Sequence, residues 1–294
     1  MGALLRHSRL AAAPLLAGAL LAAPLLRAPV AAAADKAASP WVETRQTHIR
    51  LLAARTAVGE APVTTLGLQI RLEPGWKIYW RSPGDAGIPP QFDWSGSSNL
   101  DRAAVRWPVP HRFRLFDLDT FGYTGEVVLP IEARLAKPAA PLALRLKLAY
   151  GICREVCIPY EATLALALPA GAGAPSAFAP LIERYAARVP TEGNAAGLRI
   201  TAAHLQDGPA GRELVVDAAS DRPMLAPDLL VEGPAGLSFS APKTSPGAAP
   251  SGVVFRSDVD GPKGIALAGQ EVTLTLIDGE RAIERHLRLD AAGR

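Results

Sequence analysis

Short segments in which apolar and polar residues alternate, separated by glycine and proline, constrain the fold of this chain most strongly. Thr64–Leu72 alternates at period two and ends at Pro74-Gly75, which predicts a strand followed by a turn. No segment from Trp41 to Leu168 keeps a long helical period. Further strands are predicted at Trp76–Trp80, Phe92–Trp94, Ala104–Trp107, Glu126–Ala133, Leu142–Ala149 and Ala162–Leu168. The pattern predicts an antiparallel β-sandwich within residues 35–169.

Two segments of this region are rich in turn-forming residues. Ser82–Pro90 holds three prolines and two glycines, which predicts an irregular loop. Phe116–Gly125 combines two aspartates with two glycines, which predicts an acidic hairpin loop or, alternatively, a mobile lid.

The second half of the chain repeats the strand pattern after a change of composition. Residues 170–196 are rich in Ala, Gly and Pro around one helical candidate, Ser176–Arg188, which predicts a linker with a short helix. Strands are predicted at Leu198–Ala202, Glu213–Asp217, Leu229–Glu232, Leu237–Phe239, Gly252–Arg256, Glu271–Leu276 and Ala282–Leu289. A second β-sandwich, residues 197–294, is therefore expected, and the whole protein is predicted to be all-β. This part contains neither cysteine nor tryptophan, so a structural or partner-docking module is the simplest interpretation.

The first residues have the pattern of a secretory leader. Arg6 and Arg9 form a basic start, Leu10–Leu26 an apolar run, and Ala31–Ala34 a small-residue cleavage zone. Prolines interrupt the apolar run, which is short of the roughly 20 residues that span a bilayer. We therefore expect a signal peptide at residues 1–34 and export of the remainder.

The charge balance excludes several classes of partner. Cleavage would remove three of the 31 basic residues and leave 28, equal to the 28 acidic ones. Without a basic stripe or charge block, nucleic acid and anionic membranes are not expected as partners. No segment after the leader is long and apolar enough to predict a membrane span.

Cys153 and Cys157 are the only cysteines of the chain. A disulfide requires Cα atoms within roughly 4.4–6.8 Å, which a tight turn between these residues would allow. A disulfide that closes so small a loop stabilises the fold by only about 2 kcal/mol, so stabilisation alone is a weak reason for its presence. We interpret the pair as a dithiol/disulfide exchange centre, oxidised at rest after export.

Two other interpretations of the pair remain open. Copper(I) prefers thiolates, so Cys153 and Cys157 could hold it, although two protein ligands are few for a metal site. Zinc is less suited, because it needs more protein ligands than two cysteines and the scattered histidines His48, His111, His204 and His286 offer. An inert structural disulfide in an interaction module is the third possibility. No cofactor is expected.

Aromatic residues gather ahead of the cysteines. Four of the five tryptophans lie between residues 76 and 107, and Tyr79 lies among them. Such rings are common core fillers. Their alternative role is a wall that shields the disulfide, for which Trp76, Tyr79 and Trp80 are the candidates.

Several motifs in order resemble the N-terminal periplasmic domain of the DsbD family of thiol:disulfide interchange proteins, and more closely its ScsB-type branch. They are Pro74–Pro89 (PGWKIYWRSPGDAGIP), Trp107–Pro110 (WPVP), Phe121–Tyr123 (FGY) and Cys153–Pro159 (CREVCIP). The spacing of three residues between the cysteines is that of the ScsB-type branch. The resemblance covers Trp41 to Leu168 well and the second half only loosely.

The resemblance implies an immunoglobulin-like domain in which Cys153 and Cys157 are the exchanging pair. The family's cap loop falls near Asp119–Tyr123, with Phe121 or Tyr123 as the aromatic cap.

It also implies partners and a compartment. The pair would take electrons from a membrane-embedded donor and pass them to periplasmic thioredoxin-like proteins. The chain ends at Arg294 without the transmembrane carrier of long family members, so the donor is expected to be a separate protein.

Overall fold

A computed structural model describes Gly2 and residues 37–115, 118–208, 211–262 and 269–289. The expected signal peptide lies outside these residues, apart from Gly2. Strands dominate the described part of the chain and pair almost entirely antiparallel, which confirms the predicted all-β class. No helix in these ranges is long and apolar enough to cross a membrane.

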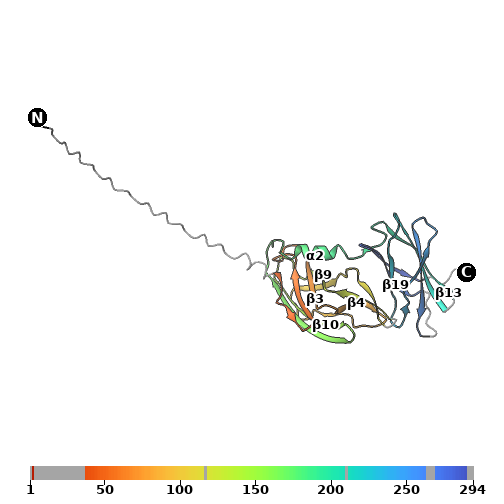
Figure 1. The fold of residues 1–294 in the computed structure, drawn as a ribbon. Coiled ribbons are helices and arrows are strands. Elements are labelled where there is room, and N and C mark those ends of the chain that lie inside the picture. Colours follow the sequence, from red (N-terminus) through yellow and green to blue (C-terminus); the bar gives the residue numbers. More distant parts are fainter. Residues whose placement is uncertain (1, 3–36, 116–117, 209–210, 263–268, 290–294) are drawn as a thin grey trace. The chain divides into compact units, whose positions relative to one another are not determined.

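The first sandwich consists of two antiparallel sheets (Figure 1). One sheet has the order β1-β2-β3-β9-β6, with β1 at Val42–Glu43, β2 at Thr47–Ala53, β3 at Val63–Leu72, β9 at Glu126–Leu135 and β6 at Leu100–Val105. The other has the order β11-β10-β4-β8-β7, with β11 at Cys157–Leu168, β10 at Leu142–Cys153, β4 at Lys77–Gly84, β8 at Leu118–Thr124 and β7 at His111–Leu115. The short strand β5, Gln91–Asp93, also pairs with β10.

Apolar residues from both sheets form the core between them. Leu66, Leu68 and Ile70 of β3 are fully buried, and Ile78 and Trp80 of β4 belong to the same apolar cluster. Successive side chains of a strand point to opposite faces, so Lys77 and Tyr79, which flank Ile78 in β4, face away from this core. The candidate functional site lies on that other face.

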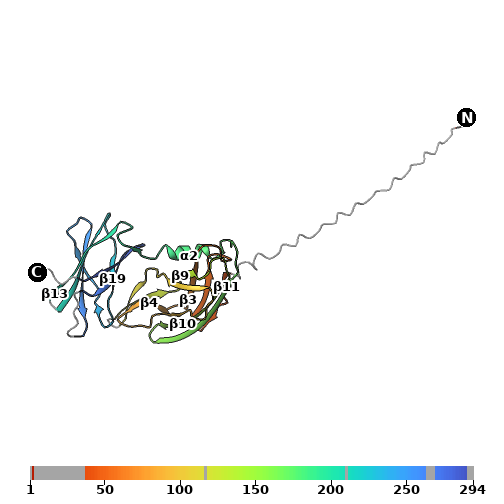
Figure 2. The same cartoon turned by 180° about the vertical axis from the view of Figure 1, so that it is seen from behind.

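The helix α2, Ala179–Ala186, packs on the first sandwich beside β9 (Figure 1 and Figure 2). Ile182 and Tyr185 bury the apolar stripe of the helix, and the Tyr185 hydroxyl donates to the Glu126 carbonyl at 2.7 Å. A Cβ added at Gly67 would lie 3.0 Å from Ile182, so a glycine there allows the helix to approach the sheet closely.

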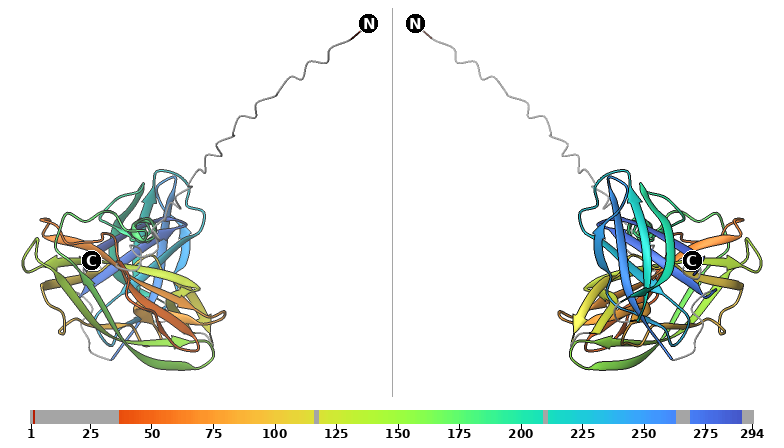
Figure 3. Two further views of the ribbon diagram at one scale, coloured as in Figure 1. Left: turned by 90° about the vertical axis from the view of Figure 1, so that its left-hand side faces the viewer. Right: turned by 90° about the vertical axis from the view of Figure 1, so that its right-hand side faces the viewer.

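The second sandwich also has two sheets (Figure 3). One has the order β12-β20-β19-β15, with β12 at Thr191–Glu192, β20 at Arg281–Arg288, β19 at Glu271–Asp278 and β15 at Pro227–Glu232. The other has the order β13-β14-β18-β16, with β13 at Leu198–Gly208, β14 at Gly211–Ser220, β18 at Gly252–Asp260 and β16 at Ser238–Phe239, while β17, Lys243–Pro246, pairs with β18. Phe255, Leu274 and Ile283 are fully buried in its core.

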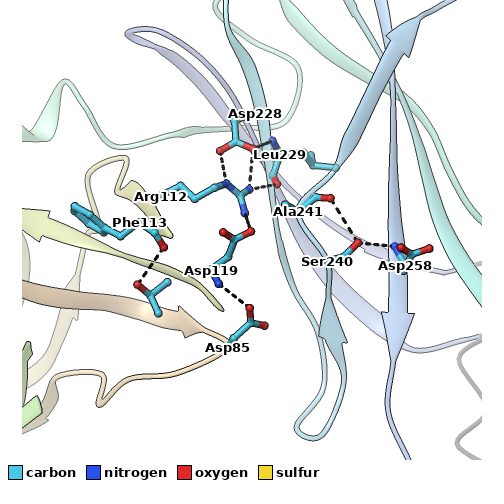
Figure 4. A network of polar contacts seen from close by, with 10 residues as sticks. Asp85, Arg112, Phe113, Asp119, Asp228, Leu229, Ser240, Ala241 and Asp258 are labelled. Atoms are coloured by element: carbon cyan, nitrogen blue, oxygen red, sulfur yellow. Dashed lines mark hydrogen bonds and ion pairs between the residues drawn. The ribbon is translucent and has the colours of Figure 1, made fainter. Parts of the chain in front are cut away.

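Both sandwiches belong to one compact unit, and arginines of the first contact carboxylates of the second. Arg112 of β7 donates to both oxygens of Asp228 on β15, at 3.0 and 2.8 Å, and to Asp119 on β8 at 3.0 Å (Figure 4). Arg81 of β4 similarly pairs with Glu232 and Glu284. Burial alone would lower the pKa of Arg81, but hydrogen bonds and charge attraction from the two glutamates raise it above its ordinary value.

One segment differs from its sequence-based prediction. Residues 118–124, predicted as part of a loop or lid, form the strand β8 and pair with β4 and β7. Phe121 and Tyr123 are buried, so their apolar surface contributes to the core instead of a mobile loop. Residues 116–117 of the same prediction lie outside the described ranges.

Candidate functional site

The two cysteines close the tip of the β10–β11 hairpin. The strands pair in register from Leu142 opposite Leu168 to Cys153 opposite Cys157, and a turn of three residues joins them. The two sulfurs form a disulfide, and the cysteine Cα atoms are 4.2 Å apart, just below the usual range of roughly 4.4–6.8 Å. Strand pairing therefore holds the cysteines face to face at the end of a long, regular hairpin.

The two cysteines differ sharply in their access to solvent. Cys153 is only 4% exposed, whereas Cys157 is exposed. Val156 beside it is 69% exposed, so the outer edge of the turn is open and partly apolar. Of the two cysteines, Cys157 is therefore the one more open to an incoming thiol.

The strand β4 supplies the neighbours of the disulfide on the outer face of the sheet. Lys77 is the register partner of Cys153, so its side chain leaves the same face from the directly opposite position. The Tyr79 hydroxyl lies 3.2 Å from the sulfur of Cys157. Because a disulfide sulfur carries no hydrogen, the hydroxyl is the donor. Burial raises the pKa of Tyr79, which keeps it protonated as a donor.

Lys77 is a buried cation with neutral partners. The residue is 8% exposed, and its Nζ donates to the Thr120 hydroxyl at 2.9 Å. Nζ also lies 5.0 Å from the centre of the Phe113 ring and 5.8 Å from that of Tyr79. Burial lowers the pKa of Lys77 from its ordinary value.

The loop after β4 lies against Tyr79 and the hairpin. A Cβ added at Gly87 would lie 2.5 Å from the Tyr79 ring, and one added at Gly151 would lie 2.6 Å from Ile88. The Asp85 amide donates to the Asp119 carbonyl at 2.9 Å, and the Asp119 amide donates to the Asp85 carboxylate at 2.8 Å. These contacts hold the loop, residues 85–90, over the side chain that contacts Cys157.

Of the proposed shielding aromatics, Tyr79 contacts the disulfide and Trp76 lies close to the turn. The guanidinium of Arg154, the residue after Cys153, stacks over the Trp76 ring with its centre 5.7 Å away. Trp80 faces the core, where its ring meets that of Phe121 edge to face at 6.3 Å.

The residues expected to form a cap lie elsewhere. Tyr123 pairs with Ile78, so both face the core, and its hydroxyl donates to the Pro108 carbonyl at 2.6 Å. Phe121, two residues earlier in β8, packs in the same core. Neither ring covers the disulfide in this structure, because strand alternation turns both to the opposite face of the sheet. Asp119 pairs with Arg112 instead.

Sequence reasoning missed Lys77 and the loop contact from Gly87. Lys77 stands in the middle of an aromatic and apolar run, WKIYW, and a period of two places it on the face of Tyr79. This spacing could have indicated from the sequence that Lys77 lies on the same face as Tyr79. Nothing local in the sequence indicates which side chain Gly87 contacts.

Metal ligands other than the cysteines are sparse. Within the described ranges, no group of three or more His, Cys, Asp or Glu side chains could hold a metal ion. The copper(I) alternative therefore relies on Cys153 and Cys157 alone, which are joined to each other here.

Comparisons with known proteins agree with the geometry of the first sandwich. Residues 50–169 match the family described as thiol:disulfide interchange protein DsbD, N-terminal, which confirms the resemblance over this domain. Residues 188–292 match a family described as a domain of unknown function, DUF8393. The crystal structure of the N-terminal periplasmic domain of ScsB from Proteus mirabilis has the same fold, with a TM-score of 0.70 and 23% identity, over 87% of this chain and 99% of that one. A search of curated proteins gave no match.

Proposed function

We propose that this protein is a periplasmic thiol:disulfide interchange protein that relays electrons through Cys153 and Cys157. The main support is the disulfide itself, which lies at the tip of a hairpin with one buried and one exposed cysteine. It lies within a domain similar to the N-terminal domain of DsbD. The electron donor is a membrane reductase, and the acceptors are thioredoxin-like proteins.

The exposure of the two cysteines gives an order to the exchange steps. A thiolate of a dithiol donor attacks the exposed sulfur of Cys157, a bond forms between the two proteins, and the Cys153–Cys157 bond breaks. The bonding electron pair leaves with Cys153 as a thiolate. The second thiolate of the donor then attacks the donor's first sulfur, which is bonded to Cys157 in the mixed disulfide, and Cys157 leaves as a thiolate. The donor ends as a disulfide, and this protein has gained two electrons.

The reduced pair passes these electrons on by the reverse chemistry. The Cys157 thiolate attacks an oxidised thioredoxin-like acceptor, and Cys153 then attacks Cys157 in the resulting mixed disulfide. The acceptor leaves as a dithiol, and the disulfide of this protein re-forms. The exposed apolar residue Val156, next to Cys157, offers contact surface for these partners.

Trapping of the mixed disulfide tests this proposal. Cys153→Ala retains the exposed thiol and is expected to accumulate a mixed disulfide with a thioredoxin-like protein. Cys157→Ala retains only the buried thiol and serves as the matched control, with at least several-fold less product. The absence of any adduct with either variant would contradict the relay.

The reduction potential gives an independent test. An exchanging pair is expected to equilibrate with glutathione or thioredoxin-like proteins, whereas structural disulfides of secreted proteins lie below about −300 mV. A value below that limit for this pair would support an inert disulfide instead.

A further inference from the structure

Lys77 has a feature that folding alone does not explain, since its ammonium is buried without a negative partner among the residues that the structure describes. Its described contacts are the Thr120 hydroxyl and the rings of Phe113 and Tyr79, and none of them is a carboxylate. Removing a cation from water is costly unless it is paired. A methionine or leucine at this position would fill the space without that cost.

The position of Lys77 opposite Cys153 indicates in which redox state of the cysteine pair the positive charge of the lysine is compensated. Lys77 and Cys153 are directly opposite on β4 and β10, and side chains at such positions have Cβ atoms roughly 4.5–5.5 Å apart. The disulfide is neutral. When it opens, negative charge appears on the sulfur of Cys153, which is as buried as the lysine. The Lys77 Nζ lies on the side of β4 away from β10, against Thr120 of β8 and Phe113 of β7, so its charge acts on the Cys153 sulfur at a distance and without a direct contact. This attraction exists only in the opened state, where few water molecules screen it.

We propose that Lys77 is a positioning residue that stabilises the Cys153 thiolate through its charge, which makes Cys153 the better leaving group and favours the reduced pair. This inference rests on the proposed exchange at Cys157. A leaving thiol of lower pKa departs faster, so Lys77 accelerates the attack on Cys157 without contact with the incoming partner.

Few other ionisable side chains of the described residues lie near Cys153. Tyr79 follows on β4, and its hydroxyl contacts Cys157. In the turn, Glu155 is exposed and Arg154 lies over the Trp76 ring. On β7, three strands away from β10, His111 is exposed and pairs in register with Gly122 of β8. Lys77 is the buried cation nearest to Cys153 in the strand register.

The test measures the acidity of one thiol in the full chain. In a Cys157→Ala background Cys153 is the sole thiol of the protein, so thiolate absorbance at 240 nm reports its titration alone. The variants are Lys77→Met, which removes the charge, and Lys77→Arg, which retains it. Lys147→Met is the matched control. Lys147 lies on β10, the strand of Cys153, but its side chain is 65% exposed and its ammonium is paired with Asp93.

Lys77→Met is expected to lower the acid dissociation constant of the Cys153 thiol about tenfold, while Lys77→Arg and Lys147→Met change it by less than twofold. With both cysteines present, Lys77→Met is expected to lower the equilibrium constant for reduction by dithiothreitol about tenfold, which corresponds to about 30 mV. A merely structural role would lower stability and leave both constants unchanged. Equal constants in Lys77→Met and the parent would overturn the proposal.

The outcomes separate this proposal from the relay. The thiol titration and the dithiothreitol equilibrium need no protein partner, so a failed trapping experiment leaves them valid. Unchanged constants would in turn leave the relay intact without a role for Lys77. If Lys77→Met does not fold by near-ultraviolet circular dichroism, Lys77→Gln replaces it. If neither folds, a Cys153 pKa in the parent at or above the ordinary value of about 8.5 contradicts the proposal.

Discussion

Tyr79 combines packing and hydrogen bonding at the disulfide. Its ring lies under the loop that contains Gly87, and its hydroxyl donates to the sulfur of Cys157. A hydrogen bond to a charged group contributes more than one to a neutral group, about 1.5–3 kcal/mol. The donor therefore favours the Cys157 thiolate over the disulfide sulfur that it contacts in the oxidised protein.

Removal of that hydroxyl tests its effect on the exposed cysteine. In a Cys153→Ala background, Tyr79→Phe is expected to lower the acid dissociation constant of the Cys157 thiol about tenfold, measured by absorbance at 240 nm. Tyr160→Phe is the control, because the Tyr160 hydroxyl on β11 donates to Gln46 at 2.7 Å. An equal effect of both substitutions would show that Tyr79 acts only by packing.

Tyr123 has a purely structural role that depends on pH. Burial raises its pKa well above the ordinary value, and the charges of Arg81 and Arg188 oppose this only in part. A group with a raised pKa in the folded state stabilises the fold below its unfolded pKa of about 10, and this contribution is lost as the pH rises above it.

The free energy of unfolding is therefore expected to fall between pH 9 and pH 11 in urea titrations. Tyr123→Phe is expected to cost about 1 kcal/mol at pH 8, since the Pro108 carbonyl loses its donor, and to flatten the fall at higher pH. The same slope in Tyr123→Phe and the parent would contradict this origin of the pH dependence.

At the scale of elements, the loop after β4 controls the surroundings of Tyr79. Gly87 has φ +142°, a conformation that other residues adopt only with strain, and a Cβ there would meet the Tyr79 ring at 2.5 Å. The loop therefore requires glycine for two separate reasons, its backbone conformation and its contact with the ring.

Gly87→Ala is expected to displace the loop or Tyr79 and to speed reduction of the disulfide by dithiothreitol several-fold. Backbone strain lowers stability as well, by about 1–3 kcal/mol. Gly125→Ala is the control, because Gly125 has φ +66° with nothing near its added Cβ. Gly125 also has a positive φ but lacks the clash, so a comparable increase in reduction rate in Gly125→Ala would refute the contact-based explanation.

At the scale of the whole molecule, partly buried ion pairs connect the two sandwiches. The Arg81 side chain is 27% exposed and lies between Glu232 and Glu284, whose side chains are 20% and 17% exposed. Arg81 follows Tyr79 by two residues in β4, so the second sandwich contacts the strand that carries the neighbours of the disulfide. Removing the arginine would leave two carboxylates close together without their cation.

Arg81→Met is expected to lower the free energy of unfolding by about 1–3 kcal/mol in urea titrations of the full chain. Arg288→Met is the control, because Arg288 and Glu271 form a pair in which both side chains are more than 70% exposed. Exposed pairs contribute about 0–1 kcal/mol. Equal losses in the two variants would mean that the contact between the sandwiches adds no stability.

Much of the fold was predictable from local patterns. Alternation at period two predicted a strand at Thr64–Leu72, and β3 begins only one residue earlier, at Val63. Turn residues correctly separated this strand from β4. The strand β8 was missed because Asp119 and Gly122 are turn formers in isolation. Only their pairing with β4 and β7 makes that segment extended.

The sequence by itself determined the all-β class and the closeness of Cys153 and Cys157, since both follow from residues near one another in the chain. The tertiary structure alone decided what surrounds the disulfide. Tyr79 contacts a cysteine 78 positions away, and Lys77 is the register partner of the other one, because β4 pairs with the end of β10. A strand pattern specifies which face a side chain takes, but not which strand will be its neighbour. That choice depends on packing of the whole core.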